Sequence, residues 1–363
     1  MPSSRARLAL VTAALLLLPV LAALLPPSAA QVRAGAAPTA QCGPGSRPET
    51  DLQGRIAPGD VASGRAAAGY TCNTEQIGSF ASSAGWRLLR YGDSAYYNGE
   101  PGGLPLALVS KPTQAGTRVM DVSDPAAPVE TDFLRSPAML SPHESMDLSP
   151  SRGLLVAAVG NLTTLTGIVD VYDVATDCRR PRLLSSANLS GVLGHEGSLS
   201  PDGRTYYIGS TTNTLTAVDL SDPSQPRTLA LTNIPSHGLS VSPDGNTLYD
   251  AVAYGPDTGL VIFDVSAIQA RTLGPVVVPG AGFRVLGKLT WPDVSIPQST
   301  IPVTIGGRPY VVENDCSAAG PASWGRHVSS TWRTHVRRGS SPSCGCRCTS
   351  RSTRRLSPVT PMR

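Results

Sequence analysis

The feature that most constrains the fold of this chain is an apolar strand motif that ends in aspartate and occurs four times. The aspartates are Asp121, Asp173, Asp219 and Asp264, which are 52, 46 and 45 residues apart. Within each copy, short runs of alternating apolar residues predict antiparallel strands. A period of about 40–50 residues with about four strands per unit is the sequence mark of a β-propeller. We therefore predict an all-β fold, a propeller of about five to six four-stranded blades, with seven as the alternative count.

One more blade is expected after residue 264, and the sequence shows only half of it. Residues 301–305 match a first strand, Gly306 and Gly307 match the turn, and residues 308–313 match a second strand. The pattern then stops. The last blade is therefore predicted to be incomplete.

Residues 1–30 have the features of a secretory signal peptide. Arg5 and Arg7 precede an apolar run over residues 8–25, and small residues stand directly before Gln31. A membrane anchor is the alternative, although the run is near the lower length limit for spanning a bilayer. We expect an exported protein, secreted or held in the cell envelope, with no membrane segment after cleavage.

Residues 31–75 are rich in Gly, Ala, Pro and Arg and predict an irregular N-terminal arm, followed by the propeller over residues 76–315. The clearest repeats begin near residue 104. An exported chain often contains disulfides, and four cysteines allow three pairings. The candidates are Cys42, Cys72, Cys178 and Cys316. The spacing favours a bond between Cys42 and Cys72, which would restrain the arm.

Residues 316–363 predict a disordered basic tail. Residues 326–363 contain nine Arg and no Lys, Asp or Glu. Because the whole chain has a formal net charge of +4, residues 1–325 carry 4 − 9 = −5. The tail has too few apolar groups to offset the burial of these charges.

The same segment can also be the product of a frame error between about residues 316 and 325. If Arg is encoded as CGN and Ser as TCN, the shifted frame can encode Ala-Thr-Arg-Val-Val-Asp-Val-Ala-Asp, which matches residues 116–124. It would supply the missing third strand of the last blade. A genuine basic tail is the alternative. If the frame is in error, the cluster of Cys344, Cys346 and Cys348 is not a metal site.

Histidines at equivalent places in successive copies are the strongest candidate site. Counted from the glycine of the following turn, His195, His237 and Gln298 lie eight residues before it and His143 lies ten. Such positions form a ring at the central channel of a propeller, where the three imidazoles could converge on a metal ion. The alternative is structural, with each imidazole joining its blade to the next by a hydrogen bond. The neighbouring Glu144 and Glu196 are expected to point away from the ring, as charges at the rim.

The four strand-ending aspartates also have two interpretations. They could bind a cation, or they could accept hydrogen bonds from the backbone amides of the following turn, which is the favoured interpretation. Residues 31–315 contain no phosphate-binding loop, Gly-x-Ser-x-Gly, His-Glu-x-x-His or paired-Cys zinc motif. The sequence therefore identifies no catalytic residues and predicts no organic cofactor.

Three short motifs resemble those of the exported LVIVD-repeat and YVTN-like propeller proteins. They are Ala-Met-Leu-Ser-Pro-His-Glu-Ser-Met at residues 138–146, Gly-Tyr-Thr-Cys-Asn-Thr at residues 69–74 and Leu-Thr-Trp-Pro at residues 289–292. The resemblance covers roughly residues 40–315 and implies the propeller fold. Members usually carry His-Glu-Cys before Ala-Tyr-Tyr, whereas Asp93 and Ser94 precede Ala95 here. The resemblance therefore assigns no disulfide pairing.

Two functions from different classes are compatible with these features. The first is a secreted or cell-surface scaffold that binds a protein, a glycan or a cell-wall component through the loops at one end. The second, by analogy with copper-binding propeller oxidases, is a metal-dependent oxidoreductase or hydrolase that uses the histidine ring. Nothing in the sequence points to nucleic acid as a partner.

Overall fold

The structure is a computed structural model that describes residues 41–50, 56–82, 85–98, 115–160, 167–189, 194–290, 296–305 and 308–316. The predicted signal peptide, the predicted basic tail after residue 316 and the proposed frame error lie outside these residues. The chain divides into two units, Met1–Asn73 and Thr74–Arg363, which are described separately. None of the described helices is long and apolar enough to cross a membrane.

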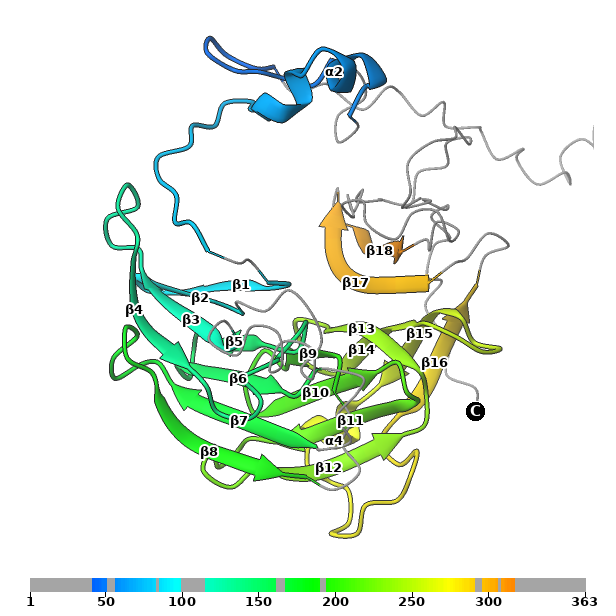
Figure 1. Ribbon diagram of the computed structural model, residues 1–363. Helices are drawn as coiled ribbons and strands as arrows, with labels where there is room; N and C mark the ends of the chain where they lie inside the picture. The colour runs from blue at the N-terminus through cyan, green and yellow to red at the C-terminus, as the bar shows by residue number, and fades with distance from the viewer. Residues whose placement is uncertain are drawn as a thin grey trace, which may run out of the picture. The chain divides into compact units, whose positions relative to one another are not determined.

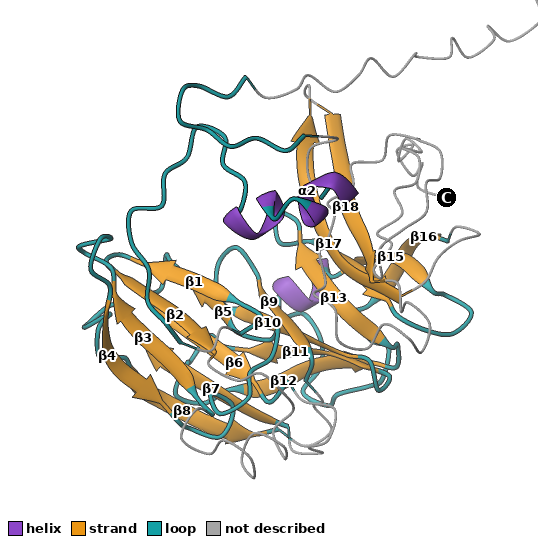
Figure 2. Cartoon of the chain, turned by 45° about the horizontal axis from the view of Figure 1, so that its top comes forward, coloured by secondary structure: helices purple, strands orange, loops and turns teal. Residues whose placement is uncertain are grey.

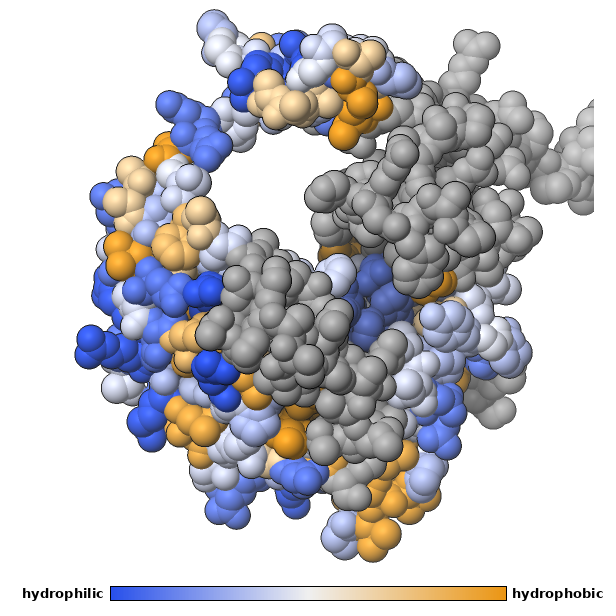
Figure 3. All heavy atoms as spheres, viewed as in Figure 1, coloured by the Kyte–Doolittle hydropathy of each residue, from blue (hydrophilic) through white to orange (hydrophobic). Residues whose placement is uncertain are grey.

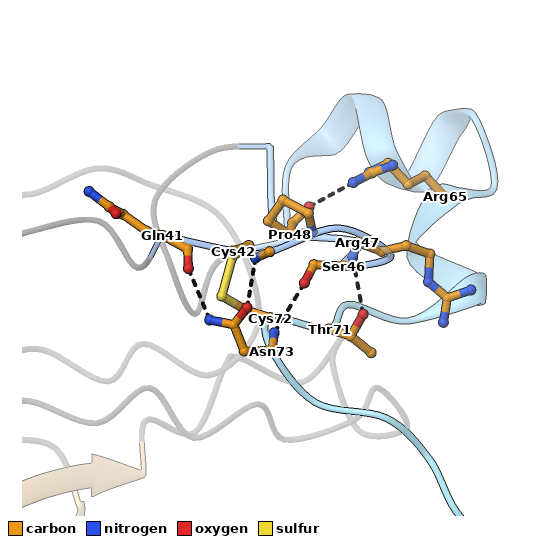
Figure 4. Close-up of a disulfide and its surroundings, with 10 residues drawn as sticks. Gln41, Cys42, Ser46, Arg47, Pro48, Arg65, Thr71, Cys72 and Asn73 are labelled. Carbon is orange, nitrogen blue, oxygen red and sulfur yellow. Dashed lines mark hydrogen bonds between the residues drawn. A yellow bond between two sulfur atoms is a disulfide. The ribbon is translucent and has the colours of Figure 1, made fainter.

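The described part of the first unit contains two short helices, α2 (Pro58–Ala62) and η1 (Arg65–Ala68), in the segment that was predicted to be irregular. Cys42 and Cys72 form the disulfide that the spacing favoured, 30 residues apart in sequence (Figure 4). Beside it, Arg47 and Thr71 exchange two backbone hydrogen bonds of 2.9 Å. The disulfide and these bonds hold together a segment with little apolar core.

The other two cysteines have different surroundings. Cys178 is a free, partly buried thiol, and its sulfur accepts a hydrogen bond of 2.9 Å from the hydroxyl of Ser94. Cys316 ends the last described strand, and its side chain lies outside the described part of the chain. Of the disulfide candidates, the structure therefore pairs Cys42 with Cys72.

The described strands of the second unit form four four-stranded antiparallel sheets and one two-stranded sheet. The first two sheets contain β1 (Leu88–Tyr91), β2 (Ser94–Asn98), β3 (Thr117–Asp121) and β4 (Val129–Leu134), then β5 (Asp147–Ser149), β6 (Leu154–Ala158), β7 (Ile168–Asp173) and β8 (Arg182–Asn188). The next two contain β9 (Glu196–Leu199), β10 (Thr205–Ser210), β11 (Thr214–Asp219) and β12 (Arg227–Thr232), then β13 (Ser236–Val241), β14 (Thr247–Val252), β15 (Gly259–Asp264) and β16 (Arg284–Leu289). The fifth contains β17 (Ile296–Ile305) and β18 (Arg308–Cys316), and the short helix α4 (Ser266–Gln269) follows β15. This is the predicted β-propeller architecture.

The first strands of successive sheets lie next to one another. β1 contacts β5, β5 contacts β9, β9 contacts β13 and β13 contacts β17. Figures 1 and 2 show these first strands on the inner side of the array, while the fourth strands β4, β8, β12 and β16 lie on its outer side. Each sheet is therefore arranged as a blade whose first strand lies on the inner side of the array.

The four repeated aspartates end the third strands of successive blades, as predicted. Asp121, Asp173, Asp219 and Asp264 are the last residues of β3, β7, β11 and β15. In each blade the pairing with the fourth strand shifts register between the residues one and two places before the aspartate. The repeat therefore preserves a β-bulge as well as a residue.

Each of these aspartates caps the turn that follows it, so the capping interpretation is confirmed. The carboxylate accepts a hydrogen bond from the amide two residues later, at 2.9 Å for Asp121, Asp173 and Asp264 and 3.0 Å for Asp219. An arginine also contacts each one; they are Arg179, Arg182, Arg227 and Arg284. The hydrogen bond from Arg179 holds the pKa of Asp121 well below its usual range. Backbone amides and guanidinium groups therefore already occupy these carboxylates.

Apolar clusters fill the seams between neighbouring blades. Tyr96 and Val119 of the first blade pack with Leu155 of the second, and the next seams are built in the same way. A smaller cluster joins Leu260 and Ile262 to Val311 of β18. Exposed hydrophobic residues are interspersed with hydrophilic ones on the face displayed in Figure 3. Packing between blades therefore provides the core, as expected for stacked repeats.

The first blade begins at Leu88, earlier than the clearest repeats near residue 104. Its first hairpin has only Gly92 and Asp93 between the paired residues Tyr91 and Ser94. The third and fourth blades use the longer Ser-Pro-Asp-Gly turn, in which Gly203 and Gly245 adopt positive φ angles of 65° and 77°. A search based on that turn therefore misses the first blade.

Asp250 on β14 is a buried carboxyl group with an incomplete set of hydrogen bonds. It is 0% exposed, and Ser236 donates a hydrogen bond of 2.6 Å to Oδ1. Oδ2 has no partner in the described part of the chain. Burial raises the pKa of Asp250 to about 7. The folded protein therefore favours the protonated form.

This environment predicts that Asp250→Asn stabilises the protein at alkaline pH. Between about pH 4 and pH 7 the unfolded chain releases a proton that the folded chain keeps, so stability falls by up to about 1.4 kcal/mol per pH unit. Asparagine does not ionise, so the variant should melt several degrees higher than the wild type at pH 8 and show a smaller difference at pH 4.5. Thermal melts at both pH values measure this, with the exposed Asp93→Asn as the control. Equal pH dependence in wild type and Asp250→Asn would contradict it.

Candidate functional site

Five side chains lie where the inner strand of each described sheet begins, one from each sheet. They are Trp86, His143, His195, His237 and Gln298. Trp86 stands two residues before β1, and His195 directly precedes β9. His237 and Gln298 are the second and third residues of β13 and β17. The structure therefore brings the predicted ring residues to equivalent places in consecutive blades.

The rings of Trp86 and the three histidines form a continuous row. The ring centroids of His143 and His195 are 4.5 Å apart, and those of His195 and His237 are 4.8 Å apart. Trp86 extends the row at the first blade, with its ring centroid 4.9 Å from that of His143. His195 is only 8% exposed, whereas Trp86 is 56% exposed. The row therefore runs from an accessible indole to imidazoles that are buried at His195 and partly buried at His143 and His237.

His143 reaches the row from a loop rather than from a strand. Its backbone has a positive φ of 51°, and it stands four residues before β5. The preceding segment is anchored because Asp170 accepts hydrogen bonds from the amides of Ala138 and Met139 at 2.7 Å and 3.3 Å. Ser145 then ties the loop to β6 by donating to the carbonyl of Ala158 at 2.6 Å. The loop is therefore fixed on both sides of His143.

Glu144 lies among the three histidines, so the prediction of a rim charge is wrong. Its Oε2 atom is 3.7 Å from Nδ1 of His143, 3.5 Å from Nε2 of His195 and 4.0 Å from Nε2 of His237. Gln298 donates from Nε2 to both carboxylate oxygens, at 3.1 Å and 3.2 Å. Strand alternation does not apply here because Glu144 follows a left-handed residue in a loop. Turning the chain at His143 places two successive side chains on the same side.

Glu196 is also interior, which corrects the second rim assignment. It is 5% exposed, and Arg87 donates from a terminal nitrogen to its Oε1 at 2.8 Å. Arg87 also reaches the carbonyl of Met146 at 3.5 Å. His195 lies before β9 and Glu196 is its first residue, so the alternation of a strand has not yet begun. The guanidinium of Arg87 therefore provides the countercharge for a carboxylate beside the ring.

Burial changes the acidity of the whole cluster. It lowers the pKa of His143 to about 4 and that of His195 to about 3, and it also lowers the pKa of His237. It raises the pKa of Glu144 to about 7, against the opposing effect of Arg87. At neutral pH the imidazoles are uncharged, so their contacts with Glu144 are not ion pairs. The cluster instead offers unprotonated ring nitrogens next to a carboxyl group.

The geometry allows the cluster to hold a small ligand. One nitrogen or oxygen from each of His143, Glu144 and His195 lies within 4.8 Å of the others. The ring of His237 is oriented by its Nδ1, which is 2.8 Å from the carbonyl of Pro297. A carbonyl accepts only, so Nδ1 carries the proton and Nε2 presents its lone pair on the side of Glu144.

The spacing of residues identified the histidines and Gln298, but it missed Trp86, Arg87 and Glu144. The first two lie in the blade with the short hairpin, so counting back from a Pro-Asp-Gly turn does not reach them. Only one signal was available for Glu144, its place next to His143 in a segment that contains Pro142 and therefore does not read as a regular strand. Loop conformation determines where Trp86, Arg87 and Glu144 lie, and the spacing of repeated residues does not predict loop conformation.

Comparisons with known proteins matched one family model and several solved structures. Residues 198–230, from inside β9 to inside β12, match the family model of the LVIVD repeat, which confirms the resemblance seen in the sequence motifs. No curated protein matches the chain. Similar solved structures are a putative 6-phosphogluconolactonase from Bacteroides uniformis, with 14% identity and a TM-score of 0.44, and the periplasmic gluconolactonase of Pseudomonas aeruginosa, with 17% identity and a TM-score of 0.41.

A third similar structure is the Swd1 β-propeller domain of Myceliophteria thermophila, with 12% identity and a TM-score of 0.41. The matches cover 63%, 61% and 62% of this chain, in the order named, and 62% of each of the three structures. The chain thus spans less than two thirds of the length of these structures. At TM-scores below 0.5 and this level of identity, these likenesses carry no argument about the chain.

Proposed function

Taking the chain as an LVIVD-repeat β-propeller, we propose that it is a binding protein that holds its ligand among His143, Glu144, His195 and His237. The observation that carries the proposal is a set of buried nitrogen atoms. Nδ1 of His143 and the ring nitrogens of His195 have no hydrogen-bond partner of good geometry within the described part of the chain. The backbone of Gly160 approaches His195 closely enough to oppose the lowering of its pKa, but it satisfies at most one of these nitrogens. Buried polar atoms in folded proteins nearly always have a partner. A ligand in the cluster would supply these missing interactions.

The charges around the cluster favour a cationic or electron-pair-accepting ligand. Glu144, Glu196 and Asp147 all interact with the single guanidinium of Arg87. Three carboxyl groups thus share one fixed positive charge, and the imidazoles add none at neutral pH. In a buried site such an excess of acidic groups is costly unless a cation or a proton compensates for it. The cluster is therefore suited to a positive ligand rather than to a phosphate or a carboxylate.

The place of action that we propose is outside the cytoplasm, secreted or in the cell envelope. The support is the signal-peptide pattern of residues 1–30 and the disulfide between Cys42 and Cys72, since disulfides persist in oxidising compartments. A protein, a glycan or a cell-wall component remains the proposed class of larger partner, and nucleic acid is not proposed. Mass spectrometry of the mature protein should find its N-terminus at Gln31.

A second candidate function is an enzyme that uses the same cluster, a metal-dependent hydrolase or oxidoreductase. The observation in its favour is the carboxylate of Glu144 within 4.0 Å of three imidazole nitrogens, an arrangement that can hold an ion and move a proton. Assays with chromogenic esters and with phenolic reductants would test it. Activity that survives Glu144→Gln and His195→Gln unchanged would rule out this cluster as its source.

The binding proposal predicts a ligand-dependent rise in melting temperature that requires the cluster. The full chain is melted alone and with zinc, copper or nickel chloride, choline, guanidinium or N-acetylglucosamine. We expect at least one cationic probe to raise the melting temperature by several degrees, because a ligand specific for the folded state stabilises it. Glu144→Gln should lose the response, and the exposed Glu75→Gln should keep it. A response to none of the probes, or an equal response in both variants, would contradict the proposal.

A further inference from the structure

We propose that the ligand of this cluster is one divalent transition-metal ion, bound by the imidazoles of His143, His195 and His237 and the carboxylate of Glu144. This inference rests on the binding function proposed above and narrows its ligand to one chemical class. It excludes organic cations and sugars, which the binding proposal alone allows.

The distances between the candidate ligand atoms are close to those of a metal centre. Zinc binds imidazole nitrogen at about 2.0–2.1 Å and carboxylate oxygen at about 2.0–2.2 Å, so two ligands of a tetrahedral ion are roughly 3.3 Å apart. Oε2 of Glu144 is 3.7, 3.5 and 4.0 Å from the nearest ring nitrogens of His143, His195 and His237. One ligand atom from each of His143, Glu144 and His195 already lies within 4.8 Å of the others. Nε2 of His237 lies 4.0 Å from Oε2 of Glu144, and a rotation of this ring would have to bring it onto the same ion as the fourth ligand.

The atoms around the cluster orient two of the ligands. Pro297 accepts a hydrogen bond from Nδ1 of His237, which leaves Nε2 free to coordinate. Gln298 donates to the carboxylate of Glu144 and holds it in place between the histidines. Such hydrogen bonds from the surroundings are a regular feature of metal sites, since they fix the tautomer and the direction of each ligand. The bond from His237 to Pro297 of β17 also joins one sheet to the next, as the structural alternative predicts, so the position of Glu144, and not this bond, supports the metal site.

The donor set indicates which metals fit. Three imidazole nitrogens and one carboxylate oxygen suit Zn²⁺, Cu²⁺ and Ni²⁺, whereas Mg²⁺ and Ca²⁺ prefer sites built from oxygen. The excess of carboxyl groups over Arg87 also favours a doubly charged ion over a singly charged one. We therefore expect transition metals to bind and alkaline-earth ions not to bind at comparable concentrations.

The sequence contains other potential ligands, and the experiment must exclude them. His327, His335 and the cysteines Cys344, Cys346 and Cys348 all lie in the basic tail. The test therefore uses the full chain with these three cysteines changed to serine and these two histidines changed to alanine. In that background the remaining histidines are the three of the cluster.

The purified protein is treated with a chelator, loaded separately with zinc, copper, magnesium or calcium, dialysed and measured for bound metal. We expect about one zinc or copper ion per chain and neither magnesium nor calcium, from the donor set above. His195→Gln should reduce the bound metal to background, while Gln298→Ala should weaken the affinity about 10–100-fold, as for other residues that orient a ligand. Copper should also quench part of the tryptophan fluorescence, and Trp86→Phe should remove that part, because the ring centroid of Trp86 is 4.9 Å from that of His143.

Each outcome either supports or overturns the inference. Circular dichroism tests whether His195→Gln is folded. If it is not, the weaker affinity of Gln298→Ala and the Trp86-dependent quenching still decide the case. Metal content that is unaffected by His195→Gln, or far below one ion per chain in the starting protein, overturns the metal site. If no metal binds, but choline or guanidinium stabilises the protein in a way that depends on Glu144, the binding function stands and the metal-ion proposal is overturned. If no probe binds, both proposals fail.

Discussion

Replacing Arg87 by methionine is expected to lower the free energy of unfolding by about 3–5 kcal/mol at pH 8, because it leaves the buried carboxylate of Glu196 without its countercharge. Glu196 is 5% exposed, and its Oε1 accepts a hydrogen bond of 2.8 Å from a terminal nitrogen of Arg87. Methionine keeps most of the volume and the apolar stem of the arginine, so the loss reflects charge rather than a cavity. Urea denaturation of wild type and variant measures the difference.

The double variant Arg87→Met with Glu196→Gln is the matched control. With no charge left to compensate, it should recover most of the lost stability, since a buried pair is far less costly to replace than to break. The single-variant deficit should also be smaller at pH 5 than at pH 8. Burial already raises the pKa of Glu196, and without Arg87 the folded chain holds this proton while the unfolded chain releases it as the pH rises. A deficit below about 1 kcal/mol at pH 8 would mean that the contact contributes as little as an exposed ion pair.

Restoring the shifted frame near residues 316–325 by a one-base edit is expected to raise the melting temperature by about 10 °C. The edit would encode a strand with three valines, and burying each is worth about 1.5–3 kcal/mol. For a chain of this size each kcal/mol corresponds to about 2–4 °C. The strand has a place to pair: β2, β6, β10 and β14 each have a partner on both sides, whereas within the described residues β18 pairs only with β17.

The comparison needs two further proteins besides the present chain. One carries the restored frame, and the other carries the same frame with the new valines changed to serine. The serine version should lose most of the gain, because it can pair its backbone but has no apolar side chains to bury. If the restored chain melts at the same temperature as the present chain and gives the same soluble yield, the frame-error interpretation is wrong.

The sequence predicted those features that depend on repetition. The spacing of Asp121, Asp173, Asp219 and Asp264 located the third strand of each blade, because every copy must end that strand with a cap for the next turn. The same reasoning placed the three histidines at equivalent positions. A residue that recurs at the same place in each repeat marks an equivalent position, even when its chemical role is unknown. For this reason the propeller fold and the histidine positions could be predicted from the sequence.

Features that occur once were not accessible in this way. Glu144 faces the histidines because His143 adopts a left-handed conformation, and a rule based on strand alternation gives the opposite direction. Arg87 and Trp86 belong to the blade whose hairpin is shorter than the others, so the counting that located the histidines passes over them. Burial then sets the acidity of Glu144, and burial depends on all the neighbouring blades together.

The placement of His143, His195 and His237 in three successive blades also affects how the protein unfolds. In stacked repeats, stability is approximately a sum of the individual units and their nearest-neighbour contacts, so an end blade can open while the others persist. A ligand held by three blades at once would couple units that otherwise interact only in adjacent pairs. Occupancy would then merge separate opening events into one cooperative transition, and a protease that cleaves partly opened blades would find fewer of them.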